Sequence, residues 1–254
     1  MKNSILYIIL SLLLVFTIQS CKKDTKTTSK NVAVTDSLPA NKEFEENGEE
    51  YEENNPEEAD VTYPETGKKA TDFLPKLGIY EIEYDAEGDL NNDGLKDIAI
   101  VLKHKDVKTA KRPMLILLQN TDKSYRLDKV SDVVMPAEYN EYDFKLYDTE
   151  DISIEKGKLL INLYGIGPSG TLLSTFKYVG KDFILNYMEA YYSGAGGRSG
   201  LTYDFEKGEI TETETNTMKE DEPTTSSTTP VKKKMHSFEN TSITEFFNED
   251  NNPS

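Results

Sequence analysis

The sequence predicts an all-β domain, in which an antiparallel meander of short strands forms a small sandwich or barrel. Short apolar or alternating segments recur at regular spacing along the middle of the chain, and glycine-containing turns separate several of them. No segment shows apolar residues sustained at the 3.6-residue spacing of an amphipathic helix. Tyrosine is abundant, with 15 residues, whereas tryptophan is absent. These features together are typical of β-rich architectures.

The first predicted strand contains Tyr80, Ile82 and Tyr84, which alternate with Glu81 and Glu83. This period of two is typical of a strand that is half buried. Further strands are predicted at residues 97–103, 113–119, 125–130, 151–156, 158–164, 171–179, 182–192 and 201–207. Tight turns are predicted at residues 155–158, 179–182 and 206–209, each of which contains a glycine.

Two segments of the predicted domain are rich in glycine. Residues 165–170, GIGPSG, have the spacing of a dinucleotide-binding loop, but Pro168 and the strand-like sequence that follows favour a simple turn. Residues 193–200, SGAGGRSG, are predicted to be a mobile loop, which could line a cleft together with Arg198. The sequence therefore predicts no nucleotide site.

The two ends of the chain differ from the middle in composition. The predicted organisation is a signal peptide at residues 1–20, a lipidated and disordered acidic linker at 21–69, a β domain at 70–211, and a low-complexity segment at 212–254. From Thr211 to Pro230 the chain is rich in Thr, Glu and Ser, which predicts a loose segment. Ser242 and Glu245 have the spacing of a capping box, so residues 231–248 form either one short docked helix or a frayed tail.

The N-terminus resembles the precursor of a bacterial lipoprotein. Lys2 precedes a mostly apolar run over residues 5–18, whose length suits a secretory signal better than a membrane span. The run ends in Ile18-Gln19-Ser20-Cys21, which resembles a lipobox, and Cys21 is the only cysteine in the chain. The resemblance implies that residues 1–20 are removed and that Cys21 carries the lipid. Lys22 after the cysteine favours the outer membrane over the inner one, with the domain facing the periplasm or the cell surface.

The charge of the chain restricts its partners. The formal net charge is −17, and residues 43–60 alone hold ten acidic side chains. Such a chain repels phosphate backbones and anionic headgroups, which argues against binding to nucleic acid and against electrostatic binding to membranes. The expected contact with the membrane is therefore the lipid anchor.

One loop carries a metal-binding pattern. In DLNNDGLKDIAIVL, residues 89–102, acidic and amide residues alternate around Gly94 and lead into an aliphatic strand. The predicted Ca²⁺ ligands are the side chains of Asp89, Asn91, Asp93 and Asp97 and the carbonyl of Leu95. Ile100 occupies the place of the bidentate glutamate of an EF-hand, so affinity should be weak, on the order of 10⁻⁴ to 10⁻³ M. The alternative is an Asp-Gly hairpin turn that binds no ion.

The pattern D-x-N-x-D-G-x-x-D followed by a strand resembles the calcium loops of integrin-type FG-GAP and VCBS repeats. Residues 72–211 as a whole are similar to a family of small exported bacterial proteins with a GDLNxDGxxD loop. Their pattern of strands includes TFKYV, residues 175–179, followed by DFIL at 182–185. The resemblance implies export and a β architecture, but it implies no reaction.

The sequence gives little support for catalysis. His104 and His236 are the only histidines, and neither belongs to a recognisable set of nucleophile, histidine and acid. We therefore expect a non-catalytic β domain with a binding or structural role, whose partner is an envelope protein or a glycan. The alternative is an exported hydrolase, or an accessory subunit of an envelope enzyme, with its site on the glycine-rich loops. A flat surface lined by tyrosine would favour the first, and a deep acidic pocket beside residues 193–200 would favour the second.

Overall fold

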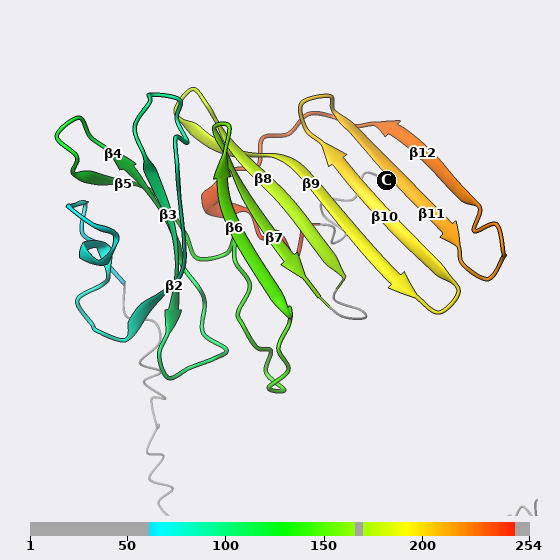
Figure 1. Ribbon diagram of the computed structural model, residues 1–254, viewed down its shortest axis with the longest axis horizontal. Helices are drawn as coiled ribbons and strands as arrows, with labels where there is room; N and C mark the ends of the chain where they lie inside the picture. Colours follow the sequence, from blue (N-terminus) through cyan, green and yellow to red (C-terminus); the bar gives the residue numbers. More distant parts are fainter. Residues whose placement is uncertain (1–60, 166–169, 247–254) are drawn as a thin grey trace, which may run out of the picture. The chain divides into compact units, whose positions relative to one another are not determined.

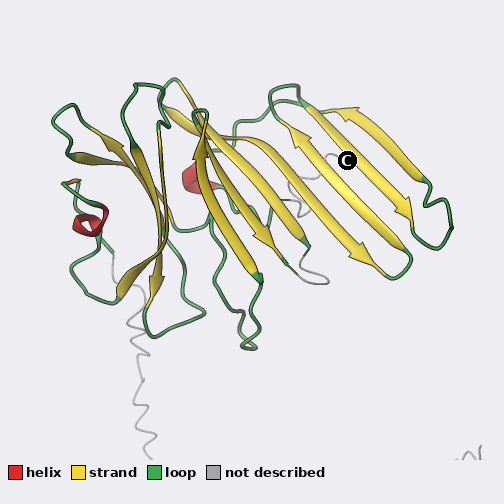
Figure 2. Ribbon diagram, in the orientation of Figure 1, coloured by secondary structure: helices red, strands yellow, loops and turns green. Residues whose placement is uncertain are grey.

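The computed structural model describes residues 61–165 and 170–246. The predicted signal peptide, Cys21, most of the acidic linker and residues 166–169 of the glycine-rich turn lie outside these described residues. Within them the fold is all-β, with strands in two antiparallel sheets and helix only as short 3₁₀ turns (Figure 2). The predicted fold class is confirmed. No helix in the described part is long and apolar enough to cross a membrane.

The first sheet has five strands in the order β1-β5-β4-β3-β2 (Figure 1). Their bounds are β1 Thr66–Gly67, β2 Tyr80–Gly88, β3 Asp97–His104, β4 Met114–Gln119 and β5 Tyr125–Ser131. The two central strands, β3 and β4, are buried on both faces, which explains why their sequences are nearly continuous runs of aliphatic residues. One face is covered by the N-terminal segment, where the 3₁₀ helix η2, Ala70–Phe73, inserts Phe73 against Ile98 and Ile100.

The second sheet has seven strands in the order β12-β11-β10-β9-β8-β7-β6. Their bounds are β6 Thr149–Glu155, β7 Lys158–Tyr164, β8 Thr171–Val179, β9 Asp182–Gly194, β10 Gly197–Asp204, β11 Glu209–Asn216 and β12 Thr224–Pro230. The predicted turns are confirmed as tight hairpins, and Gly157, Gly180 and Gly208 adopt positive φ in them. Glycine suits these positions because it has no Cβ.

The two sheets share one hydrophobic core. Ala99, Val101 and Ile116 from the first sheet join it on the face opposite Phe73, and alternate residues of β7 and β8, such as Ile161 and Phe176, join it from the second sheet. Because side chains alternate along a strand, the other residues of β7 and β8 point away from this core. This alternation defines the free face of the seven-stranded sheet.

The segment from Thr211 to Pro230 is ordered, contrary to the prediction of a loose segment. Residues 209–216 and 224–230 form β11 and β12, which extend the second sheet. Only Ile210 of these two strands is a buried apolar residue, so the hydrophobic pattern is too weak to predict them. Pairing with β10 and the β-propensity of threonine form the strands instead.

Residues 193–200 are also more regular than predicted. They form the tight β9–β10 hairpin, with Gly196 at a φ of 97°, rather than a mobile loop lining a cleft. Arg198 lies on β10 and pairs with Glu222.

The C-terminal segment docks onto the core, so the frayed-tail alternative is wrong for its described residues. A 3₁₀ helix, η4, Phe238–Asn240, buries Phe238 against Phe176 and Phe183, at ring-centroid distances of 5.5 and 5.2 Å. Phe246 is also buried. The expected capping interaction at Ser242 exists as a 3.3 Å hydrogen bond donated by Glu245 N, but the described residues after it, 243–246, form no helix.

Candidate functional site

The predicted calcium loop lies between β2 and β3 and has a turn geometry built by its own side chains. Asn92 and Gly94 have φ values of 62° and 84°. The carboxylate of Asp89 accepts hydrogen bonds from Asp93 N at 3.0 Å and Gly94 N at 2.9 Å. The side chain of Asn91 accepts from Asp93 N at 3.0 Å and donates to the Asp93 carboxylate at 2.9 Å. The structure thus brings three of the predicted ligands together on the exposed turn.

Asp97 has a different position from these three residues. It is fully buried, and its carboxylate accepts hydrogen bonds from Leu90 N at 2.9 Å, Asn91 N at 3.3 Å and Gln119 N at 3.0 Å. Burial raises the pKa of Asp97 and outweighs these backbone hydrogen bonds, which act to lower it. Because Asp97 is fully buried and its carboxylate accepts N–H groups from both the loop and β4, it anchors the loop to β4 and lies away from the exposed side of the turn, where Asp93 lies.

The loop offers a limited set of metal donors. Among residues 61–165 and 170–246, no three His, Cys, Asp or Glu side chains converge as a metal site would require. The exposed turn supplies two carboxylates, the Asn91 amide oxygen and the Leu95 carbonyl, and these hard oxygen donors are of the type that Ca²⁺ takes. They are fewer than the six to eight oxygens of a filled Ca²⁺ shell, so water would have to supply the rest.

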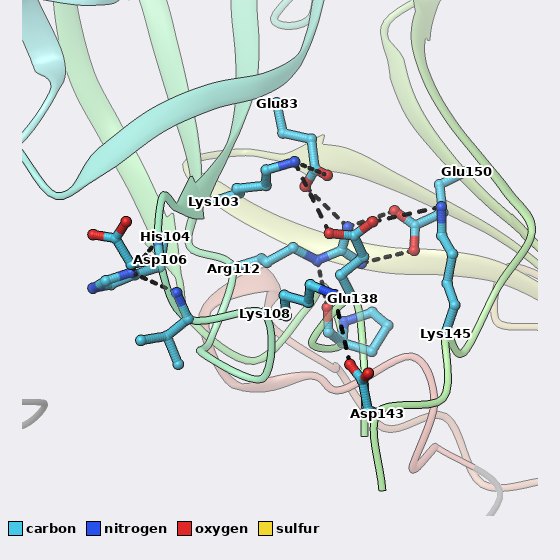
Figure 3. A network of polar contacts seen from close by, with 12 residues as sticks. Glu83, Lys103, His104, Asp106, Lys108, Arg112, Glu138, Asp143, Lys145 and Glu150 are labelled. Carbon is cyan, nitrogen blue, oxygen red and sulfur yellow. Dashed lines mark hydrogen bonds and ion pairs between the residues drawn. The ribbon is translucent and has the colours of Figure 1, made fainter. Parts of the chain in front are cut away.

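A buried polar cluster around Arg112 was not predicted from the sequence. Arg112, in the connection between β3 and β4, has a side chain only 2% exposed. Its guanidinium donates to both oxygens of Glu150 at 2.5 and 2.8 Å, to Glu83 at 3.0 Å and to the Pro136 carbonyl at 2.7 Å (Figure 3). Burial alone would lower the pKa of Arg112, but Glu150 and then Glu83 raise it above its usual value. The arginine therefore stays charged inside the protein.

This cluster connects the two sheets. Glu83 lies on β2, at a bulge between Ile82 and Tyr84, while Glu150 lies on β6 of the other sheet. The cluster continues outward through Lys103, which lies 3.5 Å from Glu83 and 3.9 Å from Glu138 (Figure 3). Lys145 lies 3.5 Å from Glu138. Burial, together with Glu150 and Glu83, also raises the pKa of the neighbouring Tyr84 to about 12. All three nitrogens of the guanidinium donate hydrogen bonds to protein oxygens, and its two carboxylate partners lie on different sheets. The arginine therefore holds the sheets together.

Both histidines make contacts within the fold: His104 accepts hydrogen bonds, and His236 packs against aromatic rings. His104 Nδ1 accepts hydrogen bonds from Asp106 N and Val107 N, both at 3.1 Å. His236 packs against Phe205 and Phe246, and burial lowers its pKa.

The free face of the seven-stranded sheet carries exposed aromatic residues. We call this surface the outer face; on the central strands it includes Leu160, Asn162, Tyr164, Thr171, Leu173, Thr175, Tyr187, Glu189 and Tyr191. Tyr164 and Tyr191 are 40% and 42% exposed. They lie in one cross-strand row, with Thr171 of β8 between them. With a strand spacing of about 4.8 Å, the two tyrosines are about 10 Å apart.

The next rows of the outer face mix polar and apolar side chains. Asn162, Leu173 and Glu189 form the row beside the two tyrosines, and Thr175 and Tyr187 form the following one. Burial, with Glu189 as a further cause, raises the pKa of Tyr187, whose hydroxyl lies 3.2 Å from that carboxylate. Tyrosine is enriched at protein interfaces, because its ring packs while its hydroxyl finds a hydrogen-bond partner. No family model, no curated protein and no solved structure matches the chain.

Proposed function

We propose that this chain is an exported lipoprotein of the cell envelope, held at the membrane by a lipid on Cys21, whose β domain binds an envelope ligand on the outer face. The observation that carries the proposal is the pair Tyr164 and Tyr191, exposed in one cross-strand row of a sheet whose other face is the core. Exposed aromatic residues on a rigid sheet lose little conformational entropy on binding, so they suit recognition. A location at the outer membrane agrees with Lys22 after the cysteine.

The outer face can be tested by substitution. In the mature chain, Tyr164→Ala combined with Tyr191→Ala should weaken binding to purified envelope fragments at least about tenfold, because two exposed anchors are lost. The matched control is Tyr142→Ala with Phe144→Ala, since these residues are 71% and 68% exposed but lie outside the sheet. Co-sedimentation at a series of fragment concentrations gives the affinities. Equal binding by the face variant and the control would contradict the proposal.

Lipidation of Cys21 gives a second expected result. Protein extracted from membranes of the native host should begin at Cys21 and carry the added mass of acyl chains, measured on the intact protein. Cys21→Ser should move the protein to the soluble fraction, because a single polar residue cannot replace an acyl anchor. A mature chain that begins at another residue would rule this anchor out.

Ca²⁺ on the exposed turn is the third part of the proposal. Asp89, Asn91, Asp93 and the Leu95 carbonyl would hold the ion, and its effect would be to stabilise the connection between β2 and β3. Gly157 lies so close to Asn92 that a Cβ there would come within 2.6 Å of the Asn92 amide nitrogen, so the turn also contacts the β6–β7 hairpin. Ordering the turn would therefore support one end of the outer face.

Calcium should raise the thermal midpoint of the protein. At tenfold excess over Kd the folded state gains about 1.4 kcal/mol, and Mg²⁺ should have much less effect because it prefers smaller octahedral sites. Asp93→Ala should abolish the rise. Asp122→Ala, in the neighbouring β4–β5 turn, should leave it unchanged. A melting curve that is the same with and without several millimolar Ca²⁺ would favour the simple hairpin turn.

A further inference from the structure

The strand β12 forms one edge of the seven-stranded sheet and pairs with β11 along its inner side (Figure 1). All seven of its residues are exposed. Its sequence, TTSSTTP, contains no charged side chain, and its register with β11 is continuous, without a bulge. A flat, uncharged edge can accept a further strand, which proteins usually prevent with charges, bulges or covering elements.

The other edges of the two sheets carry such protection. The strand β2 has a bulge between Ile82 and Tyr84 and four acidic residues, and β6 has three acidic residues. These two strands also contact each other. The strand β1 is only two residues long. Among the described strands, β12 is therefore the edge best suited to pair with another strand.

Alternate residues of β12 direct their backbone groups outward, away from the sheet. Val231 N donates to Gly208 O, on the neighbouring turn. The Pro223 carbonyl accepts a hydrogen bond from Asn216 N. Because backbone groups alternate in direction along a strand, the odd-numbered residues from 223 to 231 face β11. The residues that face outward are Thr224, Ser226, Thr228 and Pro230. All of them offer a carbonyl, and all except the proline offer an N–H group.

The segments at the two ends of β12 have opposite charge. The turn before the strand contains Glu-Asp-Glu at residues 220–222, and the segment after it contains three lysines at 232–234. Glu222 pairs with Arg198, and Lys233 donates to a carbonyl of the β10–β11 turn. The other four side chains form no ion pair among the described residues. In an antiparallel pair of β12 strands, the acidic turn of each copy lies beside the lysines of the other. The charges therefore favour a second copy of this chain as the partner.

We propose that two copies of this chain associate by antiparallel pairing of their β12 strands, with Ser227 on the two-fold axis. Residues 220–222 and 232–234 are equally distant from Ser227 along the chain, which selects this register. Ser226 of one copy then lies opposite Thr228 of the other. Outward-facing residues meet each other, as hydrogen-bonded pairs require, and about six backbone hydrogen bonds form. The axis is perpendicular to the sheet, so the outer faces of both copies lie on the same side.

Sedimentation equilibrium of the mature chain, from residue 21 onward with Cys21→Ser, measures this association. We expect a dimer with a Kd of roughly 100 µM or tighter, since the interface is short and made mostly by the backbone. Thr228→Pro should weaken the dimer about tenfold or more, because it removes an N–H that points only to the partner. Thr228→Ala is the matched control and should stay within about twofold, since it keeps the backbone donor. Urea unfolding shows that each variant is folded.

Reversal of charge tests the antiparallel orientation. Lys234→Glu should weaken the dimer several-fold, because the acidic turn of the other copy then faces a like charge. Adding Glu220→Lys to the same chain should restore the association, since the two opposite charges have only exchanged places. A double variant that associates more weakly than Lys234→Glu would contradict this orientation.

Disulfide formation tests the register. Cys21 is the only cysteine of the chain, so a cysteine introduced together with Cys21→Ser reports on one position. Ser227→Cys should form a disulfide-linked dimer in oxidised glutathione, because Cα atoms on the axis are about 4.5 Å apart. Thr225→Cys lies on the same side of the strand, but its two copies would be about 14 Å apart along the strand, so it should not.

Several results would overturn the proposal. A chain that stays monomeric at millimolar concentration has no such interface, even if Thr228→Pro loses binding to envelope fragments, because the edge would then accept a different partner. Wild-type association of Thr228→Pro would place the dimer contact on another surface. Equal cross-linking of Ser227→Cys and Thr225→Cys would exclude the register. The association does not depend on the ligand of the outer face, so its failure leaves the proposed function unaffected.

Discussion

Arg112→Ala should lower the free energy of unfolding by about 3–5 kcal/mol, the largest effect of any single substitution proposed for this chain. The substitution leaves Glu150 and Glu83, whose side chains are 2% and 8% exposed, without the guanidinium that neutralises them. It also removes a donor from the Pro136 carbonyl. Because a buried charge without a partner is strongly unfavourable, the loss should exceed that of an ordinary surface ion pair. Urea unfolding at neutral pH measures it.

Lys111→Ala is the matched control for this substitution. Lys111 is the preceding residue and pairs with Asp132 at 3.3 Å, but the two side chains are 72% and 54% exposed. Its removal should change stability by less than about 1 kcal/mol. In a double-mutant cycle, Glu150→Gln should cost less in the Arg112→Ala background than in the wild type, since the buried carboxylate is then already unpaired. Additive effects of the two substitutions would show that Arg112 and Glu150 do not act as a pair.

Asp97→Ala should destabilise the protein by about 2–4 kcal/mol, even without calcium, because three backbone N–H groups lose their acceptor. One of them belongs to Leu90, which is fully buried and cannot turn to water. Relief of the buried charge offsets part of this loss. Asp97→Asn should be milder, since the amide keeps the shape and one acceptor oxygen.

Asp93→Ala is the control for Asp97→Ala. Asp93 is exposed, so without calcium its removal should change stability by no more than about 1 kcal/mol. Unfolding in the presence of EGTA, which removes Ca²⁺, distinguishes a residue that binds the ion from one that holds the loop in place through hydrogen bonds. If Asp97→Ala were harmless in EGTA and costly only with Ca²⁺, Asp97 would be an ion ligand and not the anchor of the β2–β3 connection.

The strands with a strong hydrophobic pattern were predictable from the sequence. The predicted strand at residues 97–103 corresponds to β3, Asp97–His104, and the hairpin turn at residues 155–158 lies where its Lys-Gly pair indicated. In these segments local propensity and burial agree. The positive φ of Gly94 likewise agrees with the sharp turn that the loop pattern required.

Features that depend on distant partners were not predictable. β11 and β12 become strands because β10 pairs with β11 and β11 pairs with β12, while their own composition indicates a loose segment. Arg112 follows Lys108-Thr109-Ala110-Lys111 in the sequence and looks like a solvated charge. Its partners are 29 and 38 residues away, and no local pattern connects them.

In the loop at residues 89–97, one part was predictable from the sequence and another part depended on a distant strand. The spacing of acidic residues correctly places Asp89, Asn91 and Asp93 on one turn. It cannot distinguish them from Asp97, whose burial follows from the contact of the loop with β4. The outer face could not be predicted from the sequence either. Tyr164 and Tyr191 are far apart along the chain, and only the strand register places them in one row.

Hydroxyl-radical footprinting of tyrosine tests the proposed ligand face most directly, because it reports on each side chain separately. The mature chain is oxidised with and without purified envelope fragments, and modification of Tyr164, Tyr191 and Tyr142 is measured by mass spectrometry. All three side chains are exposed in the free protein. Binding on the outer face predicts that modification of Tyr164 and Tyr191 falls several-fold while that of Tyr142 is unchanged. Unchanged modification of Tyr164 and Tyr191 at fragment concentrations that retain the protein, or equal protection of all three residues, would contradict it.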